Sequence, residues 1–225
     1  MSTFVKYFKN IAFMTTEVGV LFDLDGVLLD TEGIYTDFWQ EIDNKYPTGI
    51  PNFAHIIKGS NLATILNTYY PDKELQKIII GILDDFEKTM MYRPFNDAME
   101  FVDKLIENNI PTCIVTSSSM EKMNNAFQQL PGFKEKFNGL VTGDMVVKCK
   151  PNPEGYLLGA KIIGIEPQNC IVFEDSLQGI QAGLNAGCKV VALTTTVDKE
   201  SISKLEANKI IENFAGFNIS DLLNL

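Results

Sequence analysis

The chain has 225 residues, 45% of them hydrophobic, so it can bury the core of one large or two small domains. Its 19 Lys and Arg are outnumbered by 29 Asp and Glu, giving a formal net charge of −10. This balance argues against a nucleic-acid or anionic-membrane surface, where positive charge would be clustered. The four cysteines are widely spaced and form no C-x-x-C pair, which predicts reduced thiols in a cytoplasmic protein.

The sequence predicts neither a signal peptide in its first residues nor a membrane-spanning helix. Residues 1–14 contain Lys6 and Lys9 but only short apolar stretches, so the hydrophobic region of a signal peptide is missing. No apolar run reaches the length of a membrane-spanning helix. Met14 is an alternative start that leads directly into the first expected strand, in which case residues 1–13 would not belong to the native protein.

The first expected strand ends in two aspartates. An apolar run from Val18 leads to Asp23 and Asp25, and Gly26 then allows a sharp turn. Because side chains two residues apart in a strand point the same way, both carboxylates are expected at its C-terminal end. Such a pair is disfavoured unless a cation lies nearby or one carboxyl is protonated. One aspartate could therefore attack a Mg²⁺-bound phosphate while the other transfers a proton, although two exposed acids at a strand end are the simpler alternative.

The next segment of the chain is predicted to be entirely helical. Its apolar spacing favours helices at residues 34–46, 62–70 and 74–91. A helical insertion after the first strand of an α/β sheet predicts a second small domain, with hinges near residues 30–32 and 92–96. We therefore expect a core domain of residues 1–31 and 94–225 and a helical cap domain of residues 32–93.

From residue 96 onward, helical and strand patterns alternate. Helices are expected at residues 96–107, 120–130, 154–163 and 176–186, and strands at residues 110–116, 139–142, 170–174 and 189–193. This alternation predicts an α/β fold with a Rossmann-like parallel sheet, covered by helices on both faces and connected by right-handed crossovers.

The expected strand ends carry further polar residues. Ligands of open α/β sheets bind beyond the carboxyl ends of the strands, where we find Thr116 to Ser119, Lys150 before Pro151, and the pair Glu174 and Asp175. Hydroxyls and amides before a helix suit a phosphate, a lysine can offset its charge, and carboxylates complete a hard-cation site. Each signal alone is weak, because Ser and Thr are ordinary helix caps and surface lysines are usually solvated.

Together these motifs resemble the haloacid dehalogenase superfamily, in its β-phosphoglucomutase-like phosphatase branch with a helical cap. The resemblance spans about residues 18–193 and rests on four motifs: Asp23-Leu-Asp25-Gly-Val, Val115-Thr116-Ser117-Ser118, Lys150-Pro151, and Val172-Phe-Glu174-Asp175-Ser-Leu-Gln-Gly179-Ile-Gln-Ala-Gly183.

The resemblance implies a role for each matching residue. Asp23 would be the nucleophile, Asp25 the acid/base, Thr116 a phosphate ligand and Lys150 the cation. Mg²⁺ would be the cofactor, held by Asp23, the backbone carbonyl of Asp25, Glu174 and Asp175. The residues expected to bind substrate are Gly26, Tyr35, Lys58, Asn61, Ser117 and Ser118. The cap would close over the site and exclude water.

The cap sequence departs from that of the mutases. Tyr35 lies where β-phosphoglucomutases carry a histidine, and the chain's one histidine, His55, is more simply structural. The loop from Lys58 resembles the substrate loop of the cap but lacks the arginine expected after its glycine, and a lysine lacks the bidentate fork of arginine. We therefore expect hydrolysis of a phosphate monoester, first of all a sugar phosphate. The alternatives are a β-phosphoglucomutase-type mutase, an inorganic pyrophosphatase and a catalytically silent binding protein.

The expected partner is thus a small phosphorylated metabolite. No nucleic-acid or membrane partner is expected, and the protein is expected to be a monomer or a weak homodimer.

Overall fold

A computed structural model describes residues 18–58 and 60–225. The expectations that concern Met14 as an alternative start and residues 1–13, as well as Gly59 of the expected substrate loop, lie outside the described residues. Within the described ranges, no helix is both long and apolar enough to cross a membrane. The four cysteines carry free thiols, and three of them are buried.

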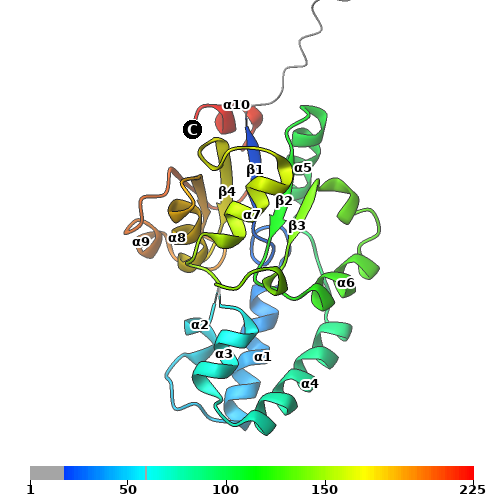
Figure 1. The fold of residues 1–225 in the computed structure, drawn as a ribbon, viewed down its shortest axis with the longest axis vertical. Coiled ribbons are helices and arrows are strands. Elements are labelled where there is room, and N and C mark those ends of the chain that lie inside the picture. Colours follow the sequence, from blue (N-terminus) through cyan, green and yellow to red (C-terminus); the bar gives the residue numbers. More distant parts are fainter. Residues whose placement is uncertain (1–17, 59) are drawn as a thin grey trace, which may run out of the picture.

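The centre of the fold is a six-stranded, all-parallel sheet with the order β3-β2-β1-β4-β5-β6 (Figure 1). The strands are β1 (Gly19–Phe22), β2 (Thr112–Val115), β3 (Gly139–Val141), β4 (Cys170–Glu174), β5 (Lys189–Leu193) and β6 (Lys209–Ile211). The chain builds outward from β1 to β3 on one side and then returns to β4 on the other. The order therefore reverses between β1 and β4, and the predicted α/β fold is confirmed.

Alternation along the strands produces two apolar layers. On β1, Val20 and Phe22 pack on one face and Leu21 on the other, all fully buried. The first face is covered by α5 (Asn96–Glu107), α6 (Met120–Gln129) and α10 (Ile219–Leu223). The second face is covered by α7 (Glu154–Ile163), α8 (Leu177–Asn185) and α9 (Lys199–Ile202). Both faces of the sheet are thus dry, as a parallel sheet requires.

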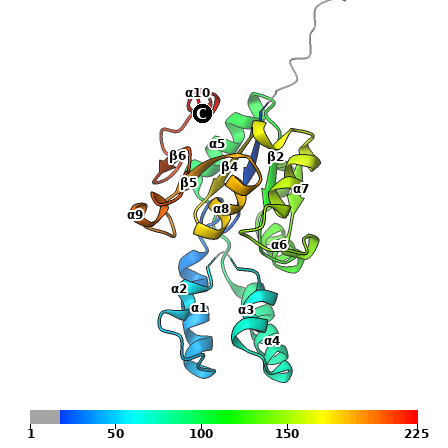
Figure 2. The same cartoon turned by 60° about the vertical axis from the view of Figure 1, so that its left-hand side comes forward.

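Four helices form a separate lobe at one end of the sheet (Figures 1 and 2). They are α1 (Glu32–Lys45), α2 (Phe53–Ile56), α3 (Leu62–Tyr69) and α4 (Lys73–Thr89), and they share their own apolar cluster. Two adjacent segments connect this helical lobe to the sheet. The amide of Asp30 donates to the carbonyl of Arg93 at 2.8 Å, and the amide of Phe95 donates to the carbonyl of Leu28 at 3.0 Å.

Several short elements differ from the sequence predictions. Helix α2, strand β6, helices α9 and α10, and the 3-10 turns at Lys134–Lys136, Gly143–Met145 and Pro167–Asn169 were not predicted. Each has at most five residues, which is too short for a helical or strand periodicity to stand out. The predicted helices and strands of the core are confirmed, and the bounds of α5 and α7 agree with the prediction at both ends.

Candidate active site

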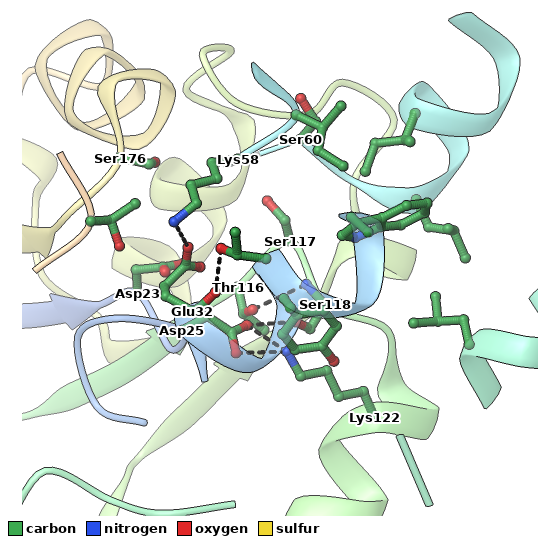
Figure 3. A pocket seen from close by; sticks show the side chains of 18 of the residues that line it. Asp23, Asp25, Glu32, Lys58, Ser60, Thr116, Ser117, Ser118, Lys122 and Ser176 are labelled. Carbon is green, nitrogen blue, oxygen red and sulfur yellow. Dashed lines mark hydrogen bonds and ion pairs between the residues drawn. The ribbon is translucent and has the colours of Figure 1, made fainter. Parts of the chain in front are cut away.

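The carboxyl ends of β1, β2 and β4 bring the predicted polar residues together. Asp23 follows β1, Thr116 follows β2, and Glu174 and Asp175 stand at the end of β4. They lie on both sides of the point where the strand order reverses, the usual ligand position in such sheets. A cavity of about 160 Å³ lies between this edge of the sheet and the helical lobe, lined by residues from both (Figure 3).

Asp23 and Lys150 form a buried ion pair at the floor of this cavity. The Lys150 Nζ lies 2.6 Å from Asp23 Oδ1 and 2.5 Å from Glu174 Oε1. Burial raises the pKa of Asp23 to about 7, with Lys150 opposing the rise and the charge of Glu174 adding to it. The Asp23 carboxylate is therefore costly to ionise in the protein alone, and further positive charge would favour its ionised form.

Three buried carboxylates are arranged to accept a cation. Asp23, Glu174 and Asp175 each offer an oxygen within 4.8 Å of those of the other two. Burial, followed by the charges of Glu174 and Asp23, raises the pKa of Asp175 well above its usual value. Mutually repelling carboxylates with oxygen donors suit a hard divalent ion such as Mg²⁺. The chemistry of the donor set therefore fits the predicted metal.

The carboxylate oxygens of this cluster differ in how many hydrogen bonds they already accept from the protein. Glu174 Oε1 accepts from Lys150 and the Tyr156 hydroxyl, and Oε2 accepts from Ser176 Oγ and the amides of Asp175 and Ser176. Within residues 18–58 and 60–225, Asp23 Oδ2 and Asp175 Oδ1 have no hydrogen-bond partner. These two oxygens are the most available to a cation.

The side chain of Asp25 points away from this cluster, toward α6. Lys122 Nζ donates to both of its oxygens at 2.6 and 2.7 Å, Ser118 Oγ donates at 2.9 Å, and Thr31 Oγ1 also donates. Burial acts to raise the pKa of Asp25, but the charge of Lys122 and these hydrogen bonds outweigh it and lower the pKa. These contacts thus favour the ionised form of Asp25 in the protein alone. The metal ligand predicted at this position is its backbone carbonyl.

The loop after β2 presents hydroxyl groups to the cavity. Thr116, Ser117 and Ser118 line the cavity, and the Ser118 amide donates to Thr116 Oγ1 at 3.0 Å. Ser119 begins α6 as its N-cap, accepting from the amide of Lys122. The predicted phosphate loop therefore combines ordinary helix capping with hydroxyls at the cavity wall.

Comparison with known proteins identifies the family to which a chain with this arrangement of residues belongs. A family model described as haloacid dehalogenase-like hydrolase matches residues 18–187, well over half of the chain. The chain belongs to the haloacid dehalogenase-like hydrolase family. The predicted resemblance is thereby confirmed, and the chain is an enzyme of the hydrolase class.

Named relatives refine the comparison. Hexitol phosphatase A of Escherichia coli is 31% identical over 194 residues, which cover 84% of this chain and 88% of that protein. A phosphorylated carbohydrates phosphatase of Thermotoga maritima is 26% identical over 178 residues, 75% of this chain and 81% of that protein. The crystal structure of a β-phosphoglucomutase from Clostridium difficile shares the fold with a TM-score of 0.74 at 23% identity, covering 92% of this chain and 95% of that one.

In this hydrolase, two predicted residues of the helical lobe line the cavity. The Tyr35 hydroxyl donates to Glu87 Oε1 at 2.7 Å, and Lys58 Nζ lies 2.9 Å from Glu32 Oε2. Burial and nearby carboxylates raise the pKa of Tyr35 well above its usual value, so its hydroxyl stays protonated. His55 is exposed on α2 and lies outside the cavity wall.

Two residues that were predicted to bind substrate lie outside the wall of this cavity. Gly26 adopts φ +76°, and a Cβ there would lie 1.9 Å from Asp175 Oδ2, so the position requires glycine for packing. The side chain of Asn61 accepts from the amide of Thr64 at 2.9 Å and caps α3, and the residue lines a smaller neighbouring cavity.

The sequence did not reveal several residues of the site. Lys122 carried one weak signal, because a lysine in the first turn of a helix opposes the helix dipole and needs a compensating partner. Thr196, which donates to Asp175, and Tyr156, which donates to Glu174, come from segments that no motif marked. Glu32 looked like an ordinary acid at a helix start.

Proposed function

We propose that this hydrolase is a Mg²⁺-dependent phosphatase that cleaves small phosphate monoesters, sugar phosphates first among them, through an aspartyl-phosphate on Asp23. The arrangement of Asp23 carries the proposal. Its carboxylate lies beside Lys150, with one oxygen unpartnered in the described chain, at the floor of the cavity. That oxygen is positioned for a ligand or a reacting phosphorus.

Asp23, Asp175 and Glu174 would hold the metal, together with the backbone carbonyl of Asp25. Bound there, Mg²⁺ would neutralise charge on the carboxylates and on a substrate phosphate. Lys150 supplies a second, permanent positive charge, since its carboxylate neighbours raise its pKa above the usual value despite burial. Thr116 and Ser117, at the end of β2, would bind the phosphate oxygens.

The proposed reaction has two steps. Asp23 attacks phosphorus and the bond to the leaving oxygen breaks. Asp25 donates to that oxygen the proton that it takes from water at the end of each turnover. A water molecule then attacks the phosphorus of the aspartyl-phosphate and gives its proton to Asp25, which releases phosphate and restores the Asp23 carboxylate. Lys122 stabilises the ionised form of Asp25 that acts as the base in the second step.

Hydrolysis is favoured over phosphate transfer between sugar positions, because the groups of the helical lobe that could bind a second phosphate are already paired with protein carboxylates. A mutase must bind a second phosphate, whereas Lys58 is already paired with Glu32 and Tyr35 with Glu87. An inorganic pyrophosphatase would equally need extra positive charge. A silent binding protein would have no use for the buried Asp23–Lys150 pair, because burying ionisable groups is costly.

The proposed cap domain comprises residues 32–93, with the core domain formed by residues 1–31 and 94–225. Closure of the cap about the two segments near residues 30–32 and 92–96 would exclude water during the attack.

Phosphate release from a panel of phosphorylated metabolites, with and without Mg²⁺, tests the proposal, with β-glucose 1-phosphate isomerisation assayed in parallel. We expect Mg²⁺-dependent release from a few sugar phosphates and no isomerisation. Isomerisation would contradict the choice of hydrolysis, and silence on the whole panel would contradict phosphatase activity.

A further inference from the structure

The two ends of the cavity differ in chemistry. The end at the sheet carries the charged and hydroxyl groups described above. The end in the helical lobe has an apolar wall from α1, α3 and α4, formed by Trp39, Leu62, Ile65 and Leu83, beside the acidic side chains of Asp84 and Glu87 on α4. A phosphate bound beside Asp23 therefore directs the rest of its ester toward an apolar wall, which favours an apolar portion at that end of the substrate.

Every lysine that residues 18–58 and 60–225 contribute to the cavity wall is paired with a protein carboxylate. Lys58 pairs with Glu32 at 2.9 Å, Lys122 with Asp25 at 2.6 Å, and Lys150 with Asp23 at 2.6 Å. The chain's one arginine, Arg93, is not in the wall. In the described part of the chain, the wall contains six carboxylates, Asp23, Asp25, Glu32, Asp84, Glu87 and Asp175, against these three lysines. Mg²⁺ would offset the negative charge of the carboxylates at the strand ends but not that of the carboxylates in the helical lobe.

Lys58 is the lysine that the helical lobe contributes to the wall. It follows α2 and reaches Glu32, the first residue of α1, just above Asp23 and Asp25 (Figure 3). The two side chains are only 17% and 22% exposed, so their attraction is poorly screened by water. A second anion on a substrate would have to displace Glu32 from Lys58 or bind next to its negative charge.

We propose that Glu32, by neutralising Lys58, restricts this enzyme to phosphate monoesters whose leaving group has an apolar end and no second anionic group. The proposal rests on the phosphatase activity proposed above. It makes Glu32 a specificity-determining residue and sets sugar monophosphates with an apolar face apart from bisphosphates and phosphorylated acids.

Three aryl phosphates that differ only at the para position test this proposal: 4-methylphenyl, 4-(hydroxymethyl)phenyl and 4-carboxyphenyl phosphate. For the wild type we expect kcat/KM to be highest for the methyl compound and about ten-fold lower for the carboxylate. Because the substituents also change the reactivity of the leaving group, variants are compared by the ratio of kcat/KM for two substrates. That ratio isolates the contacts of the pocket.

Glu32→Gln removes the negative charge and leaves Lys58 free for a substrate carboxylate. We expect kcat/KM for the carboxylate to rise about ten-fold relative to the methyl compound, because a charge-assisted hydrogen bond is gained. The double variant Glu32→Gln/Lys58→Met should lose this gain. Glu74→Gln is the matched control, since it removes one acid from an exposed ion pair with Lys77 on α4 and should leave the ratio unchanged.

Leu62→Gln tests the apolar wall at a half-buried position, where folding should be preserved. It should lower kcat/KM for the methyl compound more than for the carboxylate. An equal response of all substrates to Glu32→Gln would mean that Lys58 serves the transferred phosphate, and it would overturn the proposal. Absence of phosphate release from all three compounds would instead refute the phosphatase activity itself.

Discussion

Lys122 donates to both carboxylate oxygens of Asp25, and its ammonium also lies 4.2 Å from the centre of the Tyr35 ring. The contact joins helix α6, the loop after β1 and helix α1 of the helical lobe. Only 3% of the Lys122 side chain is exposed, so the lysine gives up its hydration for this position. The proposed acid/base is therefore held by a cation that also contacts the proposed cap.

Replacing Lys122 by methionine should impair the step that needs ionised Asp25. Without the lysine, burial becomes the main influence on the pKa of Asp25 and raises it. The acidic limb of the pH profile of phosphate release should move to higher pH, and kcat at neutral pH should fall about 10- to 100-fold. Lys122→Arg keeps the charge and should retain most activity. A pH profile identical to that of the wild type would refute this role.

Asp23→Asn should lower turnover at least about 10³-fold, because an amide cannot form the acyl phosphate. The variant should stay folded. Since burial raises the pKa of Asp23 to about 7, a neutral amide avoids the cost of the buried charge in the metal-free protein. Phosphate release and thermal unfolding measure the two effects, and wild-type turnover in a folded variant would contradict the assignment of the nucleophile.

Stabilisation by Mg²⁺ should depend on pH. The pKa of Asp23 is raised to about 7 and that of Asp175 well above its usual value, so below these pKa values the folded state binds more protons than the unfolded state. In the metal-free protein, the free energy of unfolding therefore falls as the pH rises from the ordinary pKa of an aspartate to the raised pKa values of these two groups. Mg²⁺ binds the ionised carboxylates, so it competes with protons.

The increase in Tm caused by Mg²⁺ should therefore be larger at about pH 8 than at about pH 6. Asp175→Asn should lose most of this increase, while the exposed substitution Glu74→Gln should keep it. Equal increases at both pH values would speak against metal binding by this carboxylate cluster.

Two buried tyrosines form a matched pair for stability measurements. The Tyr156 hydroxyl donates to Glu174 Oε1 at 2.9 Å, whereas the buried Tyr70 hydroxyl has no hydrogen-bond partner in the described chain. Tyr156→Phe should lower the free energy of unfolding by about 1.5–3 kcal/mol, because it removes a hydrogen bond to a charged group. Tyr70→Phe should leave it unchanged or raise it. Equal losses in denaturant unfolding would show that the Glu174 contact is not special.

The sequence predicted the parts of the site that follow from local patterns. The strand preceding Asp23 and the one ending at Glu174 were visible as apolar runs, and parallel pairing then brings both residues to one edge of the sheet. The Asp25–Lys122 contact could not be predicted in this way. The two residues are 97 positions apart, and their pairing depends on how α6 packs beside the loop after β1.

The helical lobe shows the same limit. The positions of Tyr35 and Lys58 were predicted to face substrate, but their partners Glu87 and Glu32 depend on the packing of α1 against α4 and of the loop after α2. Gly26 was marked by its sequence context as a turn residue. Its actual constraint, the close approach of Asp175, comes from a strand far along the chain.

Asp25→Asn, incubated with Mg²⁺ and 4-nitrophenyl phosphate, whose leaving group departs without a proton from Asp25, and then digested for mass spectrometry, tests the central claim most directly. Asparagine cannot accept a proton from water, so breakdown of the aspartyl-phosphate should slow and a phosphoryl group should accumulate on Asp23. The Asp23→Asn/Asp25→Asn double variant serves as the control and should remain unmodified. We predict phosphorylation confined to Asp23; normal turnover with no trapped phosphoenzyme, or phosphorylation at another residue, would contradict the proposed mechanism.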